Sequence, residues 1–190
     1  MNNFYENSVY QFSDVCLENE YRYYLRAEIL NPKSNRHLLV VQLNPSKANG
    51  SKSDATAGKV CHWAARNNYA VVHFLNLFAR IATIQTEISR QISYEKLVGV
   101  GNKNDDQLID ILRSVPKNTP VVFAYGEPDG VLCIHYSRRV LEVETLLKKR
   151  GVKKIFRVGP LSNGQFPRHG RAWNKNVQLE VLDFHSGAQN

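Results

Sequence analysis

The sequence lacks the cysteine patterns of a disulfide framework or a zinc site. Its three cysteines, Cys16, Cys61 and Cys133, lie far apart, and no Cys-x-x-Cys pair occurs. Isolated cysteines are typical of a reducing compartment, so we expect a cytoplasmic protein. No apolar run reaches membrane-spanning length, and no basic segment followed by an apolar one marks a secretory signal. We therefore expect no membrane partner.

Several motifs of nucleotide chemistry are also missing. Neither the glycine signature of P-loop enzymes nor that of dinucleotide-binding folds occurs. The His-x-Glu and Pro-Cys-x-x-Cys pattern of zinc deaminases is absent. Few carboxylates follow the expected strands, whereas metal-dependent nucleases cluster them. We expect a site that uses no metal and no cofactor.

What is present is a basic chain of ordinary globular composition. Its 190 residues are 43% hydrophobic, which suits one domain over residues 1–190. The formal net charge is +8 and the sequence pI is about 9.5. Such a balance favours a polyanionic partner, of which nucleic acid is the commonest, although a soluble protein can also be basic without one. We expect a monomer.

Buried apolar runs alternate with helical patterns along the chain. Residues 1–19 show little periodicity and are predicted to be an irregular lead-in, and residues 186–190 a frayed tail. Turn residues after the first strand predict a hairpin between that strand and the next one. The predicted strands are 21–30, 38–43, 71–75, 120–125 and 154–158. The predicted helices are about 54–67, 104–115 and 131–150, with a loop or short helix over 84–103 and a closing helix to about Phe184.

This alternation predicts an α/β fold with three layers. We expect a three-layer sandwich with a central, mainly parallel four-stranded sheet, and an N-terminal hairpin strand beside it. Right-handed crossovers bring the carboxyl ends of parallel strands to one edge. Asn44, Asn76, Tyr125 and the loop after Val158 should therefore line a single cleft, where open α/β sheets bind ligands.

Two of the strands end at an asparagine. Asn44 precedes Pro45, which cannot continue a central strand, and Ser46 adds a hydroxyl. Asn76 carries both donors and an acceptor, the combination that a nucleobase edge requires, although it could equally cap a turn. Phe78 could stack on a base, but a core phenylalanine is the more ordinary interpretation.

The loop after the last core strand is rich in glycine, proline and positive charge. Arg168, Arg171 and Lys175 form a cationic group that suits phosphate. The alternative is a charged surface loop without a ligand. Asn104 is predicted to be the N-cap of its helix, and the acidic residues after it suit the positive helix end.

Six short motifs in order resemble domain-of-unknown-function family 1643. The motifs are Leu43-Asn44-Pro45-Ser46, Asp54-Ala55-Thr56, Asn76 to Thr83, Asn104-Asp105, Tyr125-Gly126 and Gly164 to His169. The resemblance covers roughly residues 38–171. The family usually has proline where Ala55 stands, tryptophan where Tyr125 stands, and proline where Gly170 stands.

The layout is also similar to the uracil-DNA glycosylase superfamily. That superfamily likewise ends its first strand with Asp-Pro or Asn-Pro and has a leucine run ending in asparagine, as at Phe74 to Leu77. Its closing histidine loop corresponds to residues 158–162, where Arg157 aligns with the histidine. The resemblance implies a uracil-DNA-glycosylase-like fold.

The resemblance implies hydrolysis of an N-glycosidic bond in DNA, double-stranded with a flipped base or single-stranded. Asn44 would hold the attacking water, and general-base help would either come from Asp54 or be absent. His169 or Arg157 would stabilise the departing base. The implied substrate is a damaged or modified base, such as those of phage DNA. The implied base-contacting residues are Asn76, Phe78, Tyr125, Pro45 and Ser46. The implied backbone contacts are Lys47, Lys52, Arg80, Ser162, Arg168, Arg171 and Lys175.

Two other classes of function stay open. One is a nucleic-acid-binding module without catalysis, and the other is an enzyme that acts on free nucleotides or nucleosides.

Overall fold

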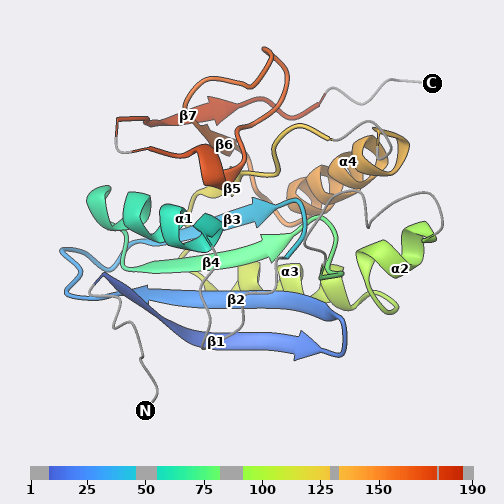
Figure 1. Cartoon of the computed structure of the whole chain (residues 1–190), viewed down its shortest axis with the longest axis horizontal. Helices are drawn as coiled ribbons and strands as arrows, with labels where there is room; N and C mark the ends of the chain where they lie inside the picture. The colour runs from blue at the N-terminus through green and yellow to red at the C-terminus, as the bar shows by residue number, and fades with distance from the viewer. Residues whose placement is uncertain (1–8, 46–54, 82–91, 129–132, 175, 186–190) are drawn as a thin grey trace.

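A single mixed sheet of seven strands organises the computed structural model, which describes residues 9–45, 55–81, 92–128, 133–174 and 176–185. The spatial order is β1-β2-β4-β3-β5-β6-β7, fanned from bottom to top in Figure 1. The strands are β1 (Tyr10–Glu18), β2 (Tyr21–Ile29), β3 (His37–Gln42), β4 (Val71–Asn76), β5 (Val121–Phe123), β6 (Ile155–Val158) and β7 (Leu179–Leu182). The helices are α1 (Ala55–Arg66), α2 (Tyr94–Val98), α3 (Lys103–Ser114), α4 (Cys133–Lys149) and the 3-10 helix η2 (Gly170–Ala172).

The four predicted core strands form the parallel centre of this sheet. β3 pairs parallel with both β4 and β5, and β5 pairs parallel with β6. The short apolar runs of β3, β4 and β5 are buried, as expected for strands covered on both faces. However, β1, β2 and β7 add antiparallel pairings on the flanks. The prediction of a mainly parallel four-stranded sheet is therefore wrong in extent.

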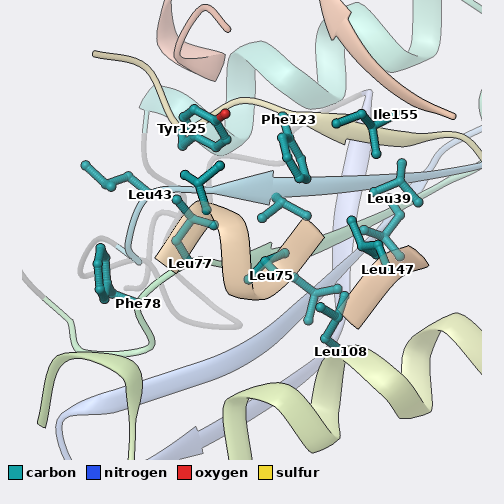
Figure 2. Packing of buried hydrophobic residues seen from close by; sticks show 14 of the residues in the cluster. Leu39, Leu43, Leu75, Leu77, Phe78, Leu108, Phe123, Tyr125, Leu147 and Ile155 are labelled. Carbon is teal, nitrogen blue, oxygen red and sulfur yellow. The ribbon is translucent and has the colours of Figure 1, made fainter. Parts of the chain in front are cut away.

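Helices cover both faces of the sheet because successive strand residues point to opposite sides. Leu38 and Val40 pack in one buried cluster with the helix α1 residues Val60 and Trp63. Leu39 lies in the other cluster, with residues of α2, α3 and α4. Figure 2 shows part of this second cluster, whose end carries Leu43, Leu77 and Tyr125. The three layers that the sequence predicts are present.

The N-terminal segment is where the prediction of an irregular lead-in is wrong. Residues Tyr10–Glu18 form β1, which pairs antiparallel with β2. Asn19 has a positive φ of 52°, as a tight hairpin turn requires, and this asparagine was the available sequence signal. Residues 1–8 and 186–190 lie outside the described part of the chain.

The predicted hairpin between the strands at Tyr21 and Leu38 is also wrong. β4 lies between β2 and β3, and β2 runs antiparallel to β4 in the register Leu25 to Phe74. The chain does turn after β2 as predicted, but it continues into β3, which is separated from β2 in the sheet by β4. The predicted closing helix is wrong as well, because Leu179–Leu182 is strand β7.

Candidate functional site

The order of the parallel strands creates a switch point at the carboxyl edge of the sheet. From β3 the chain passes through α1 to β4 on one side, and it later returns to β5 on the other side. The loops after β3 and β5 therefore leave in opposite directions, and this is where open α/β sheets place their ligands. The segment Gln42–Pro45, called here the β3 tip, lies on one side of this point.

The β3 tip is held in place by backbone hydrogen bonds that continue beyond the paired strands. The amides of Leu77 and Phe78 donate to the carbonyls of Gln42 and Leu43, at 2.8 and 2.9 Å. Pro45 is buried, and the half-buried Asn44 donates from Nδ2 to the Pro45 carbonyl at 3.3 Å. The predicted site residues Ser46, Lys47, Lys52 and Asp54 lie outside the described residues.

Residues 167–171, called here the His169 loop, dock onto the end of β5. The amide of Gly126 donates to the Pro167 carbonyl at 3.1 Å, and the amide of Gly170 donates to the Ala124 carbonyl at 3.4 Å. Gly126 has a φ of 76°, and a Cβ there would lie 2.9 Å from the Cβ of His169. His169 therefore lies directly against the end of β5.

Gly170 connects the His169 loop to the β3 tip. A Cβ at Gly170 would lie 2.8 Å from Val60 Cγ2 and 3.5 Å from the side-chain nitrogen of Gln42. Gln42 stands two residues before Asn44 on the same segment. The structure thus brings the strand that carries Asn44 and the loop that carries His169 to the same switch point.

His169 caps the short helix that follows it. Its Nδ1 accepts a hydrogen bond from the amide of Arg171 at 3.2 Å. The residue as a whole is half-buried. Because Nδ1 accepts, the neutral ring carries its proton on Nε2 and can donate it. The predicted role of His169 in stabilising a departing base stays a prediction.

The other predicted asparagine, Asn76, is enclosed by the protein. Its side chain is 4% exposed and donates from Nδ2 to the Arg22 carbonyl at 3.4 Å. Its Oδ1 has no hydrogen-bond partner among the described residues. Phe78 is fully buried in the cluster of Figure 2. Reading and stacking of a base by these two residues would require them to become exposed, and both roles stay predictions.

A buried polar network supports the β4 end, and the sequence analysis missed it. Nδ2 of Asn104 donates to the carbonyls of Asn76 and Leu77, both at 3.1 Å. Nε of Arg139 donates to the Leu77 carbonyl at 2.6 Å, and the guanidinium is ion-paired with Asp105. The N-cap prediction for Asn104 is wrong, since Asn102 occupies that position.

Tyr125 is 2% exposed and packs among aromatic rings. Its centroid lies 5.2 Å from that of Phe123 and 5.4 Å from that of Tyr136. Burial, with a smaller contribution from Glu144, raises the pKa of the Tyr125 phenol, so the group stays neutral. One side of Tyr125 borders a pocket, and its role as a stacking surface stays a prediction.

Two predicted cationic residues are engaged by carboxylates. Arg157 is ion-paired with Glu180 at 2.6 Å across the β6–β7 ladder. Arg80 contacts Glu20 through both guanidinium nitrogens at 2.7 Å. Arg168 is half-buried and Arg171 is exposed, and neither forms an ion pair with a described residue.

The remaining predicted contacts are less well defined. Ser162 is half-buried in a turn in which its amide donates to the Phe166 carbonyl at 2.7 Å. Lys175 lies outside the described residues. Within the described ranges, no three side chains of histidine, cysteine, aspartate or glutamate gather as metal ligands would. None of the described helices combines the length and apolar character needed to cross a membrane.

One exposed carboxylate near the site was not anticipated. Glu127 directly follows Gly126 at the end of β5 and accepts a hydrogen bond from Asn163 at 2.7 Å. The sequence feature that could have indicated Glu127 is its position, because it is the first acidic residue after β5. It places an acceptor for a proton on the same edge as His169.

Together these features define an α/β protein with a candidate ligand site at the carboxyl edge of a mixed sheet. The chain belongs to the family described as "Protein of unknown function (DUF1643)", whose model matches residues 22–169. That match includes both the β3 tip and His169. Comparisons with curated proteins and with solved structures found no match. The similarity to uracil-DNA glycosylases therefore stays a prediction.

Proposed function

We propose that the protein is a DNA N-glycosylase-like hydrolase, which removes a flipped, modified or damaged base and leaves an abasic site. The observation that carries the proposal is the docking of the His169 loop on both β5 and the β3 tip. The amide of Gly170 donates to the Ala124 carbonyl. A Cβ at Gly170 would lie 3.5 Å from the side-chain nitrogen of Gln42, so the loop passes close to the β3 tip. Asn44, His169 and Glu127 lie on segments that meet at this edge, where α/β sheets bind ligands, and this supports the proposal.

The reaction would transfer one water molecule across the glycosidic bond. Asn44 would orient the water beside the sugar carbon, but a carboxamide cannot take its proton. Glu127, or Asp54 from outside the described residues, would accept that proton and contribute about 10²–10⁴-fold. As the carbon–nitrogen bond breaks, His169 would donate a proton or a hydrogen bond to the departing base. The water oxygen remains on the sugar.

Positive charge at the same loop suits the DNA backbone. Arg168 and Arg171 lie on either side of His169, and the chain has a net charge of +8. Arg80 and Arg157 are already neutralised by Glu20 and Glu180. We therefore assign the phosphate contacts to Arg168 and Arg171 and leave Arg80 and Arg157 out of them.

The deciding experiment incubates the protein with duplex and single-stranded DNA that carries uracil, a mismatch or a hypermodified cytosine. Abasic sites are detected as strand breaks after alkaline treatment. Asn44→Ala should lose at least tenfold in rate. Of Glu127→Gln and Asp54→Asn, the variant that removes the general base should lose about 10²-fold or more. Asn102→Ala, which truncates an exposed asparagine, is the matched control and should retain the rate.

A second candidate is a nucleic-acid-binding module without catalysis. The burial of Asn76 and Phe78 favours it, because a base-reading pair is not exposed. Tight, salt-sensitive binding with no abasic sites on any substrate would support this candidate and overturn hydrolysis. Activity on mononucleotides alone would instead indicate an enzyme of free nucleotides.

A further inference from the structure

A pocket of about 400 Å³ lies on the α4 side of the sheet, beside the turn that precedes the His169 loop. Tyr125, Leu141 and Phe166 give it apolar walls, and Ser137, Gln165 and His185 give it polar groups. Its volume falls within the usual range for small-molecule sites. None of the predicted roles explains this combination.

The pocket adjoins the candidate site through Gly126 but is separate from it. The hydroxyl of Tyr136, another lining residue, donates to the Gly126 carbonyl at 2.6 Å. The backbone amide of Gly126 instead binds Pro167 in the His169 loop. Gly126 is therefore hydrogen-bonded to a residue of each feature.

Aromatic rings give the pocket a shape that suits a flat ligand. The Tyr136 ring meets Tyr125 edge-on at 5.4 Å and Phe166 at 6.1 Å between centroids. Phe166 is half-buried, so part of its surface is supported by the core and part is accessible. Rings fixed in this way offer apolar surface to a planar guest without a further loss of side-chain freedom.

His185 contributes an imidazole whose orientation is fixed by a buried carboxylate. Glu144 is 1% exposed, and its Oε1 lies 2.7 Å from Nδ1 of His185. The backbone amide of His185 donates to Oε2 of Glu144 at 2.9 Å. Because the buried carboxylate must be satisfied, Nδ1 carries a proton and Nε2 is left to contact a ligand.

The polar groups of the pocket match the edge of a nucleobase. Gln165 is exposed and offers a donor and an acceptor in one plane, and Ser137 adds a hydroxyl. Nucleobases combine a flat apolar face with donors and acceptors on the rim. A purely apolar ligand would leave those protein groups without partners.

We propose that this pocket binds a nucleobase, which packs against Phe166 and is hydrogen-bonded by Gln165 and His185. The inference concerns binding alone. It stands whether or not Asn44 takes part in hydrolysis, because Phe166, Gln165 and His185 are not among the residues assigned to hydrolysis. The base can come from a free nucleoside or from single-stranded DNA, and the test separates these sources.

The test titrates the whole chain with the four deoxynucleosides and, separately, with short single-stranded oligonucleotides, using saturation-transfer NMR and calorimetry. Toluene and phenol serve as aromatic ligands without a base edge. We expect saturable binding of at least one nucleoside or oligonucleotide. Binding of the oligonucleotide alone would identify the strand as the source.

Ser137→Tyr fills the pocket from an exposed position, so it should weaken binding at least tenfold without unfolding the chain. Ser114→Tyr makes the same substitution at an exposed position of α3, outside the pocket lining, and should bind like the parent. Gln165→Ala should weaken nucleobase binding while leaving toluene unaffected.

Three results would overturn the proposal. The first is the absence of saturable binding in both nucleobase arms. The second is equal affinity for toluene and the best nucleoside. The third is unchanged affinity in both Ser137→Tyr and Gln165→Ala.

Discussion

Asn104 holds the β4 end through two hydrogen bonds from a single side-chain nitrogen. Removing it in Asn104→Ala leaves the Asn76 carbonyl without this partner inside the protein. Unsatisfied buried groups cost about 1–3 kcal/mol, so we expect a loss of that size in the free energy of unfolding. Urea denaturation measures it.

The matched control for Asn104 lies on the same helix. Asp110→Ala removes only an exposed ion pair with Arg113 and should change stability by less than about 1 kcal/mol. Equal losses in the two variants would mean that the Asn104 contacts do not support the β4 end.

Gly170 gives a second prediction, because close contacts surround its α-carbon. Gly170→Ala places a methyl group 2.8 Å from Val60 Cγ2, so we expect a loss of about 1–3 kcal/mol. Val60→Ala in the same chain removes the clashing methyl group. Denaturation of the two single variants and the double variant should show that the double variant is more stable than the sum of losses predicts. Strict additivity would contradict the packing of this loop.

The sequence indicated which residues end the strands but not which of them are exposed. Asn44 and His169 were predictable because proline and glycine mark the ends of apolar runs. The burial of Phe78 agrees with the more ordinary interpretation, a core phenylalanine. The enclosure of Asn76 was not predictable, because it involves residues distant in the sequence, such as Asn104. A local sequence pattern does not show which side chains are buried by residues that are distant in the sequence.

At the level of elements, central strands were predictable and edge strands were not. The runs in β3 and β4 are buried on both faces, which leaves a clear apolar signal. β1 and β7 lie at the edges, and most of their residues are exposed or half-buried. Strand order also escaped prediction, because β2 joins β4 by packing and not by its proximity to β3 in the chain.

A histidine at the junction of three strands makes stability depend on pH. Nδ1 of His73 lies 2.7 Å from the Tyr24 hydroxyl, and its Nε2 lies 3.1 Å from Nδ1 of His37. Burial, followed by His37 and Arg26, lowers the pKa of His73 to about 4 from 6.5. A neutral ring can satisfy both contacts, since one nitrogen donates and the other accepts.

The sign of this pH effect follows from proton uptake. Between pH 6.5 and 4 the unfolded chain binds a proton at His73 that the folded chain does not bind. The free energy of unfolding should therefore fall as the pH falls through this window, by up to roughly 3 kcal/mol. Denaturation of the parent and of His73→Gln at pH 7 and 4.5 isolates this contribution. Parallel losses in both proteins would assign the effect to other groups.

At the level of the whole molecule, the proposed DNA contacts require positive charge that is not paired with carboxylates. The chain carries 25 lysines and arginines against 17 acidic residues, but several arginines are bound to carboxylates in the fold. Net charge alone therefore overstates the surface available to DNA. The His169 loop is the place where cationic side chains lie beside the switch point without an acidic partner among the described residues.

Salt dependence of DNA binding tests that distribution of charge. If Arg171 and Arg168 contact phosphates, each substitution by glutamine should lower the slope of log affinity against log salt by about 1, because each contact releases counterions. Arg80→Gln and Arg157→Gln remove the same charge from residues paired with Glu20 and Glu180, and should leave the slope near that of the parent. Fluorescence anisotropy with a labelled duplex between 50 and 200 mM salt, about the range over which such slopes are read, gives all five values. Equal slopes for the two pairs of variants would contradict the assignment. The salt dependence would then follow the net charge of the protein and not phosphate contacts made by the His169 loop.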